Sequence, residues 1–299
     1  MGSDFWWFYD VVSVAILLFC IFINGRRGWA KSLVSFIGVA FSFIIALSVS
    51  SSISSSVYNG MIKNSNVKKI NETLSSKDIS RELSDYLETL GYIVDVNPNQ
   101  IKKIFESDKE YDEQIYRYLN NINGKKVDDE EVFYEKLHDI YGSIMSGYIS
   151  DNLNEYSAEN ARKDVIENPE KMNEFIELML DKENKLSAAQ YIELNYTAEP
   201  YKKIIRLIVF LIIFVIINVL FIFVVRSLVG KQFNMQGIGS HLIGGLIGFA
   251  YGGVFVVVAA IIVRLNVIMG SNEMLFFNFT TIDKTYIFEY VYNFVTNNM

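Results

Sequence analysis

The chain is poor in the residues that build most cross-linked and metal-binding sites. It has 299 residues with one cysteine, Cys20, which lies inside an apolar run, and two histidines, His138 and His241. One cysteine cannot form an intramolecular disulfide, and a zinc site would have to recruit carboxylates. We therefore expect no disulfide, no metal ion and no cofactor.

Sequence motifs of the common enzyme classes are absent as well. The chain has no G-x-x-x-x-G-K-S/T phosphate-binding loop, no G-x-S-x-G and no H-E-x-x-H. The segment Gly237-Ile-Gly239 lacks the third glycine of a dinucleotide-binding loop, and no βαβ pattern surrounds it. Because no nucleophile lies beside a base, we expect a protein that is not an enzyme and has no catalytic residue.

Charge is distributed very unevenly along the chain. Residues 51–200 carry 29 acidic and 17 basic side chains, a net of −12. The remaining residues carry 5 acidic and 10 basic side chains, a net of +5, and together these give the overall −7. Apolar residues show the opposite distribution, since they concentrate in the first 50 residues and after about residue 204. This division is typical of a membrane protein with one polar insertion.

Four apolar stretches are close to the roughly 20 residues that a helix needs to cross a bilayer. One of them contains 19 residues without a charge, from Leu207 to Val225. We predict an all-α membrane protein with four transmembrane helices in two hairpins and an inserted α-helical extracytoplasmic domain. The predicted spans are about 5–24, 33–49, 205–225 and 242–263.

The pattern divides the chain into four parts. The first membrane hairpin covers 1–50, the acidic domain 51–200 and the second membrane hairpin 201–264, and an aromatic amphipathic tail covers 265–299. We expect that tail to contain a helix lying on the membrane surface. Its predicted apolar face consists of Tyr286, Ile287, Tyr290, Val291 and Phe294.

Within the polar domain, the spacing of apolar residues predicts five to seven amphipathic helices. The serine-rich segment 51–60 is expected to be an exit linker from the membrane. Ile79, Leu83 and Leu87 recur at helical spacing, and Asp128 with Glu131 resembles a capping box.

The last membrane span is rich in glycine on one face. Gly244, Gly248 and Gly252 recur every fourth residue, and Gly245 and Gly253 lie beside them. In a helix this spacing leaves one face without side chains. Such faces let helices pack closely in a bilayer, so we predict that these five glycines are helix-packing residues.

Two polar residues lie within the predicted spans, Asp10 and Asn218. An intramembrane carboxylate can be a proton or ion site, but Asp10 is near the end of its helix, where it can instead cap or be solvated. Asn218 is expected to hydrogen-bond across helices. A role for either residue in conduction is the alternative.

Basic residues indicate the topology. The segment Gly25-Arg26-Arg27-Gly28-Trp29 is a tight basic turn between the first two helices, and Arg226 and Lys231 occupy the second short loop. The positive-inside bias places both loops in the cytoplasm. We therefore expect both termini and residues 51–200 outside. The high content of Ile, Lys and Asn suggests an AT-rich bacterial genome.

In their order and placement, these features resemble the colicin V production protein (CvpA) family. That family has an acidic residue near the start of its first helix, matched by Asp10, and a basic G-x-x-R-G-aromatic turn, matched by Gly25-Arg26-Arg27-Gly28-Trp29. Its late D-x-x-x-G-x-x-x-G-x-x-x-G helix is matched by Gly244, Gly248 and Gly252. The resemblance covers roughly residues 1–50 and 200–299.

Two departures limit what the resemblance implies. Ser240 stands where the family has the acidic residue before its glycines, and residues 51–200 are much longer than the family's usual connection. The resemblance implies a multi-pass protein of the bacterial plasma (inner) membrane, linked to toxin export and envelope maintenance and without an agreed biochemical activity. We expect a non-catalytic scaffold or accessory factor in these processes. The alternative is a subunit of an oligomeric channel or transporter for ions or small solutes. Expected partners are the lipid bilayer, a protein bound through 51–200 and a second copy of the chain, but no nucleic acid.

Overall fold

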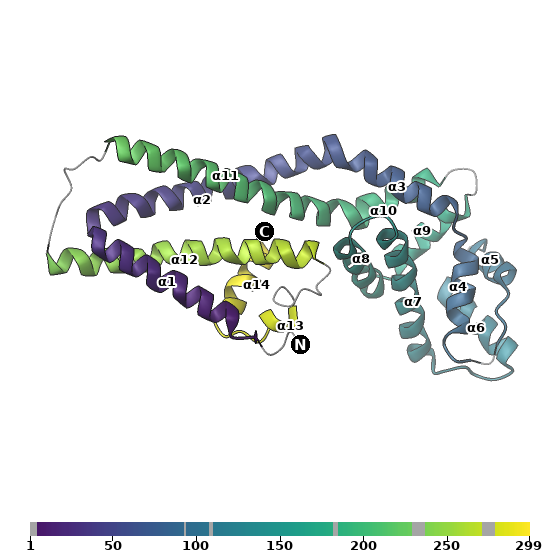
Figure 1. The fold of residues 1–299 in the computed structure, drawn as a ribbon. Coiled ribbons are helices and arrows are strands. Elements are labelled where there is room, and N and C mark those ends of the chain that lie inside the picture. Colours follow the sequence, from purple (N-terminus) through teal and green to yellow (C-terminus); the bar gives the residue numbers. More distant parts are fainter. Residues whose placement is uncertain (1–4, 93, 108–109, 182–184, 229–236, 271–278) are drawn as a thin grey trace. The chain divides into compact units, whose positions relative to one another are not determined.

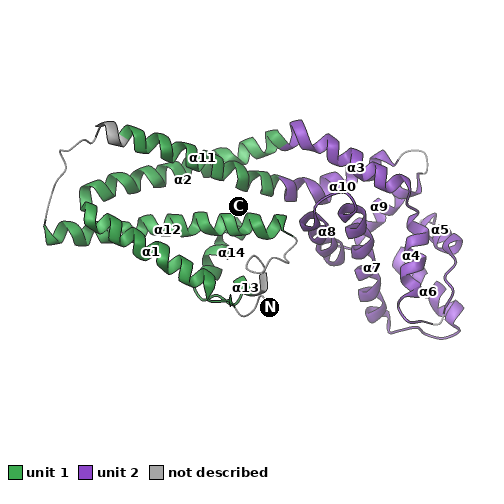
Figure 2. Ribbon diagram, viewed as in Figure 1, with its two compact units in different colours: residues 1–57, 202–299 green, residues 58–201 purple. Residues whose placement is uncertain are grey.

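The computed structural model describes residues 5–299 apart from 93, 108–109, 182–184, 229–236 and 271–278 (Figure 1). Over this range the chain forms helices and no strand, which confirms the all-α prediction. Four helices are long and apolar enough to cross a membrane, as predicted. The chain divides into two compact units, which we call the membrane unit (1–57 and 202–299) and the polar unit (58–201) (Figure 2).

The membrane unit consists of long apolar helices followed by two short ones. Helix α12 packs along α1 and α2, and the short helix α14 also packs on α12 and α1. The helices are α1 (Phe8–Arg27), α2 (Trp29–Val57), α11 (Ala198–Leu228, which begins in the polar unit), α12 (Ile238–Met269), α13 (Phe279–Ile282) and α14 (Phe288–Asn298).

The connection between α1 and α2 is shorter than the sequence suggested. We expected a loop of about eight residues, but α1 continues through Arg27 and α2 begins at Trp29. Gly28 alone separates them, with φ of 78°. An L-residue with a side chain rarely adopts this conformation, so glycine is what permits so sharp a reversal. The basic residues therefore belong to helix ends and not to a loop.

The prediction of a serine-rich linker over 51–60 is wrong. Helix α2 runs through Val57 and continues as a π-helix, η2 (Tyr58–Ile62), without an intervening coil. Serine hydroxyls along this stretch donate to backbone carbonyls one turn back, as Ser54 does to Ser51 and Ser56 to Ser52. Serine favours turns because its hydroxyl can replace the hydrogen bonds that backbone groups make in a helix. A serine whose hydroxyl donates to a carbonyl of the preceding turn is nevertheless compatible with a helix.

Aromatic side chains fix α11 in the membrane unit. Phe43 of α2 meets the rings of Phe210 and Phe214 at centroid distances of 5.1 and 6.3 Å, both in edge-on geometry. Phe214 also contacts Phe255 of α12 at 6.2 Å. Gly38 of α2 lies against the ring of Phe221, where even a methyl group would clash. Helices α2, α11 and α12 thus meet in one cluster of aromatic rings.

The tail forms a helix as predicted, but the predicted apolar face is the exposed one. Phe288, Tyr292 and Val295 of α14 are buried. Tyr290 and Phe294, from the predicted face, are 76% and 54% exposed. Both faces of α14 are therefore aromatic, and the packed face is offset from the one that the sequence singled out.

The described residues of the polar unit form eight α-helices, more than the five to seven expected, and two π-helices. Its buried residues form one continuous hydrophobic core with members from Val67 to Tyr196. The helices not yet given are α3 (Lys63–Ser75), α4 (Ile79–Glu88), α5 (Pro98–Phe105), α6 (Tyr111–Asn123), α7 (Glu130–Ser150), α8 (Glu155–Glu167), α9 (Glu170–Leu180), α10 (Leu186–Ile192) and the π-helix η3 (Glu193–Thr197).

One local prediction in this unit is right and another is wrong. Ile79, Leu83 and Leu87 are almost completely buried along α4. The expected capping box of Asp128 and Glu131 does not form, because α7 begins one residue later, with Asp129 at its N-cap and no side-chain cap bond. The Asp128 carboxylate instead accepts hydrogen bonds from Lys136 Nζ and the Tyr92 hydroxyl. These two hydrogen bonds hold the pKa of Asp128 below its usual value. The bond from Lys136 has the larger effect.

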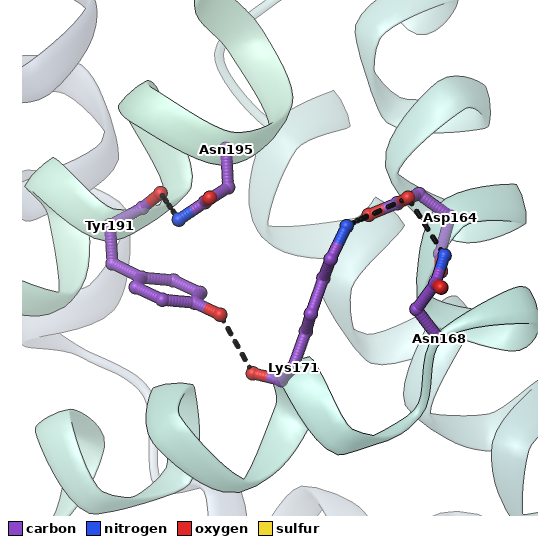
Figure 3. A network of polar contacts seen from close by, with 5 residues as sticks. All are labelled: Asp164, Asn168, Lys171, Tyr191 and Asn195. Carbon is purple, nitrogen blue, oxygen red and sulfur yellow. Dashed lines mark hydrogen bonds and ion pairs between the residues drawn. The ribbon is translucent and has the colours of Figure 1, made fainter.

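A polar network fastens α8, α9 and α10 to one another (Figure 3). Asp164 accepts from Lys171 Nζ at 2.7 and 2.9 Å and from Asn168 Nδ2 at 3.1 Å. The Tyr191 hydroxyl donates to the Lys171 carbonyl at 2.9 Å, and Asn195 Nδ2 donates to the Tyr191 carbonyl at 3.0 Å. These groups bond to one another, so the network is best explained as structural.

Candidate functional site

The glycine face of α12 packs on α1 of the same chain. A Cβ atom at Gly244 would lie 2.7 Å from the Asn24 carbonyl oxygen, and one at Gly248 would lie 2.6 Å from the Cys20 carbonyl oxygen. A Cβ at Gly252 would lie 3.1–3.2 Å from the nearest atoms, which belong to Leu17 and Cys20. The closest atoms are main chain at Gly244 and Gly248, so there the backbones of the two helices approach directly.

The two remaining glycines of this group are in different surroundings. A Cβ at Gly245 would make an ordinary contact with Ile21 Cγ2 at 3.6 Å. A Cβ at Gly253 would meet nothing within 4 Å, so Gly253 takes no part in this close approach and differs from the expectation for it. The functional face therefore consists of Gly244, Gly248 and Gly252, with Gly245 at its edge.

The basic turn lies beside the start of α12. His241 Nδ1 is 2.7 Å from the Gly25 carbonyl oxygen, and the Trp29 amide donates to Ser240 Oγ at 3.3 Å. Arg26 and Arg27 are exposed. The Arg26 guanidinium lies 5.5 Å above the ring of Phe22. Lys231 of the second loop lies outside the described residues, as does the side chain of Arg226.

Asp10 binds the start of the C-terminal helix. Its Oδ2 accepts from the Tyr286 amide at 2.7 Å, and its Oδ1 accepts from the amides of Ile287 and Phe288, both at 2.9 Å. The first amides of a helix lack partners within the helix and carry partial positive charge, so a carboxylate there is stabilising. Asp10 thus joins α1 to α14 as a cap supplied from a distant part of the chain.

Arg264 is a buried cation directly after the predicted end of the fourth span at residue 263. Helix α12 continues past it to Met269, and Arg264 is 8% exposed. Its Nη1 donates to the Tyr292 hydroxyl at 3.1 Å, and its guanidinium lies 5.7 Å from the Tyr292 ring centroid. Tyr9 stacks on Phe288 beside this contact, with ring centroids 4.7 Å apart. In the sequence, the apolar pattern that resumes after Arg264 could have indicated that the helix continues past this residue.

Asn218 does not form the cross-helix bond that we expected of it. Its Nδ2 donates to the Phe214 carbonyl at 2.8 Å, one turn back on the same helix. The side chain is half-buried.

Two polar clusters occupy the polar unit. The buried Glu193 accepts from the Tyr58 hydroxyl at 2.9 Å and lies 3.6 Å from Lys63 Nζ, so it connects the two π-helices. The second cluster pairs Asp112 of α6 with His138 and Tyr141 of α7, at 2.8 and 2.9 Å. Burial raises the pKa of the Tyr141 phenol well above its usual value. Both clusters connect helices that pack together, which is a structural role.

Within the described ranges, no group of three or more His, Cys, Asp or Glu side chains could hold a metal ion. The all-α fold and the four long apolar helices of the described residues are consistent with a multi-pass α-helical membrane protein. Comparison with protein-family models, with curated proteins and with solved structures gives no match. The resemblance to the CvpA family therefore rests on the motifs described above.

Proposed function

We propose that the protein is a non-catalytic membrane scaffold, an accessory factor in toxin export or envelope maintenance of the CvpA type. The observation that carries the proposal is the separation of roles between the two units. A membrane unit packs through glycine and aromatic contacts, and a polar unit has its own hydrophobic core. Such a polar unit can present a folded surface to a protein partner while the membrane unit holds it at the bilayer.

The polar groups of the membrane unit support a scaffold more than a conduction path. Asp10 is bonded to three amides at the start of α14, and Asn218 is bonded to its own helix. Arg264 is held against Tyr292. In the structure each of these side chains thus makes a hydrogen bond that holds a helix or its end in place. In this proposal the protein works at the bacterial plasma membrane, with both termini and the polar unit outside.

The partner surface that we propose is a groove between α4 and α7 of the polar unit. It has a volume of about 490 Å³ and is lined by Tyr86, Leu90, Lys136 and Ile140, among others. The Tyr86 side chain is 39% exposed there. Tyrosine is enriched among the residues that contribute most to binding at protein interfaces, and polar residues form their rim.

A complementation experiment tests this proposal. A bacterial strain that lacks the protein receives the full chain, a chain without residues 58–201, or the full chain with Tyr86→Ala. We expect the full chain alone to restore detergent resistance and toxin secretion, although all three insert in the membrane. Glu72→Ala, which changes a 64%-exposed side chain outside the groove, is the control and should also restore both. Restoration by the chain without residues 58–201 would contradict the scaffold role.

The channel alternative has its own test. Proteoliposomes that contain the full chain should show no more ion flux than empty vesicles if the scaffold proposal holds. Flux that disappears on Asn218→Leu would instead favour a channel, because the hydrogen bond of this half-buried side chain lies within its own helix.

A further inference from the structure

The membrane unit contains an open groove of about 850 Å³ between α1 and the start of α12. This volume lies within the range of roughly 300–1,000 Å³ that is usual for small-molecule sites. The two helices run in opposite directions past each other, because Gly25 lies against His241 and Ile21 lies against Gly248. The groove therefore has two ends of different character.

One end of the groove is apolar. It is lined by Ile21, Phe22, Leu246 and Phe249, and the last three are 61%, 74% and 56% exposed. Gly245 contributes no side chain to this wall, which leaves the space open beside Ile21. Such exposed apolar walls on a helix of membrane-spanning length are suited to hydrocarbon and not to water.

The other end of the groove is cationic. Arg26 lines it and is exposed, and among the described residues no carboxylate pairs with it. His241 lies opposite, and since a carbonyl oxygen only accepts, its Nδ1 donates to Gly25. The first amides of α12 begin at Ile238 and add partial positive charge. An anion with oxygen acceptors complements this end.

We propose that this groove binds an anionic glycerophospholipid. Its phosphate accepts hydrogen bonds from the Arg26 guanidinium, whose planar donors match phosphate oxygens. One acyl chain lies along Ile21, Leu246 and Phe249, in the space that Gly245 leaves open. The occupant is a lipid and not a soluble phosphate, because the larger part of the groove wall is apolar.

Competition between two lipids tests the proposal on the full chain. The protein, purified in detergent, is incubated with equal amounts of phosphatidylglycerol and phosphatidylcholine that carry the same acyl chains. Bound lipids are then counted by native mass spectrometry. We expect phosphatidylglycerol to be retained preferentially, and Arg26→Gln to reduce this preference about fivefold, the change that corresponds to about 1 kcal/mol for one basic residue near a membrane.

Matched variants separate the two ends of the groove. Gly245→Leu fills the apolar end and should lower retention of phosphatidylglycerol, whereas Gly253→Leu places the same side chain on the same helix in open space and should not. Arg27→Gln removes the neighbouring exposed arginine, which does not line the groove, and should preserve most of the preference.

Three outcomes would overturn the proposal. They are equal retention of the two lipids, an unchanged preference in Arg26→Gln, and displacement of phosphatidylglycerol by inorganic phosphate alone, which would indicate a simple anion site. Because Arg26 is exposed, we expect Arg26→Gln to fold as the wild type does. Its result therefore stands even if Gly245→Leu fails to fold. The scaffold proposal does not depend on this result.

Discussion

The two units of the chain differ in which side chains they bury and which they expose. In the polar unit, Leu83, Phe133 and Phe175 are completely buried. In the membrane unit, Phe19 and Phe223 are 64% and 66% exposed, while glycines occupy the contact between α1 and α12. Water drives large apolar side chains inward, whereas lipid tails are as apolar as leucine and leave close packing to drive association. The same chain thus follows two different packing rules.

The largest expected effect comes from forcing a large side chain into the glycine contact. Gly248→Leu would place a Cβ 2.6 Å from the Cys20 carbonyl oxygen and 2.9 Å from Ile21 Cα, and main-chain atoms cannot turn aside as a side chain can. Overpacking usually costs about 1–3 kcal/mol, and we expect the upper end or more here. Thermal unfolding in detergent measures the change. Gly253→Leu is the matched control, and equal stability of the two variants would show that the glycine face is not a packing surface.

A core truncation in the polar unit should have a comparable but separate effect. Leu83→Ala removes a side chain with no exposure, and such changes cost about 2–5 kcal/mol. Because the polar unit has its own core, we expect hydrogen exchange to rise in α4 and its neighbours while α1 and α12 remain protected. Tyr86→Ala, at a partly exposed position on the same helix, is the control. Faster exchange throughout α12 would show that the two units unfold together.

A smaller effect is expected from removing the charge of Asp10. Asp10→Ala eliminates the acceptor for three amides, which should cost about 0.5–2 kcal/mol, as for other helix caps, and should fray α14. Asp10→Asn keeps one acceptor oxygen and should lie between wild type and Asp10→Ala. Hydrogen exchange over 286–298 reports the change. The exposed Asp283→Asn is the control, and unchanged exchange in Asp10→Ala would remove the capping role.

The smallest effect concerns pH and the polar unit alone. The pKa of Asp128 is lowered in the folded state, so its contribution is present above the unfolded value of about 3.9 and is lost as pH falls through the folded value. At neutral pH, Asp128→Asn should cost less than about 1 kcal/mol, because its partner Lys136 is 39% exposed. Unfolding measured at neutral and at acidic pH should show this difference shrinking in acid. Asp85→Asn, at an exposed position, should show no such trend.

How well the sequence predicted the fold differs between local and distant features. The four long helices and the α4 pattern were predictable, because run length and periodicity are properties of neighbouring residues. The serine stretch 51–60 was mispredicted, because the return of serine hydroxyls to the preceding turn depends on the helix already being present. The basic turn was predicted at the right place, but its restriction to Gly28 was not, since a basic segment is as compatible with helix ends as with a loop.

The candidate site was predictable only as a set of separate residues. Spacing identified the glycine face, Asp10 and the basic turn, but not which residues meet them. Asp10 and the amide of Phe288 are 278 residues apart, and His241 and Gly25 are 216 residues apart. Contacts at such separations leave no periodic signal in a single sequence. Arg264 was overlooked because it was taken as the boundary of an apolar run, although the run resumes after it.

The bond between Asp10 and the start of α14 also sets an order of events during synthesis. The carboxylate is made 276 residues before the first amide that it binds, so α1 is synthesised long before this charge can be capped. Only when the last helix has left the ribosome can the carboxylate, Tyr9 and Arg264 acquire their partners in α14. A chain that stops short of Phe288 would therefore keep an open polar patch in its membrane unit. Such an unfinished chain would differ from the finished one by a carboxylate in α1 that has no helix start to cap.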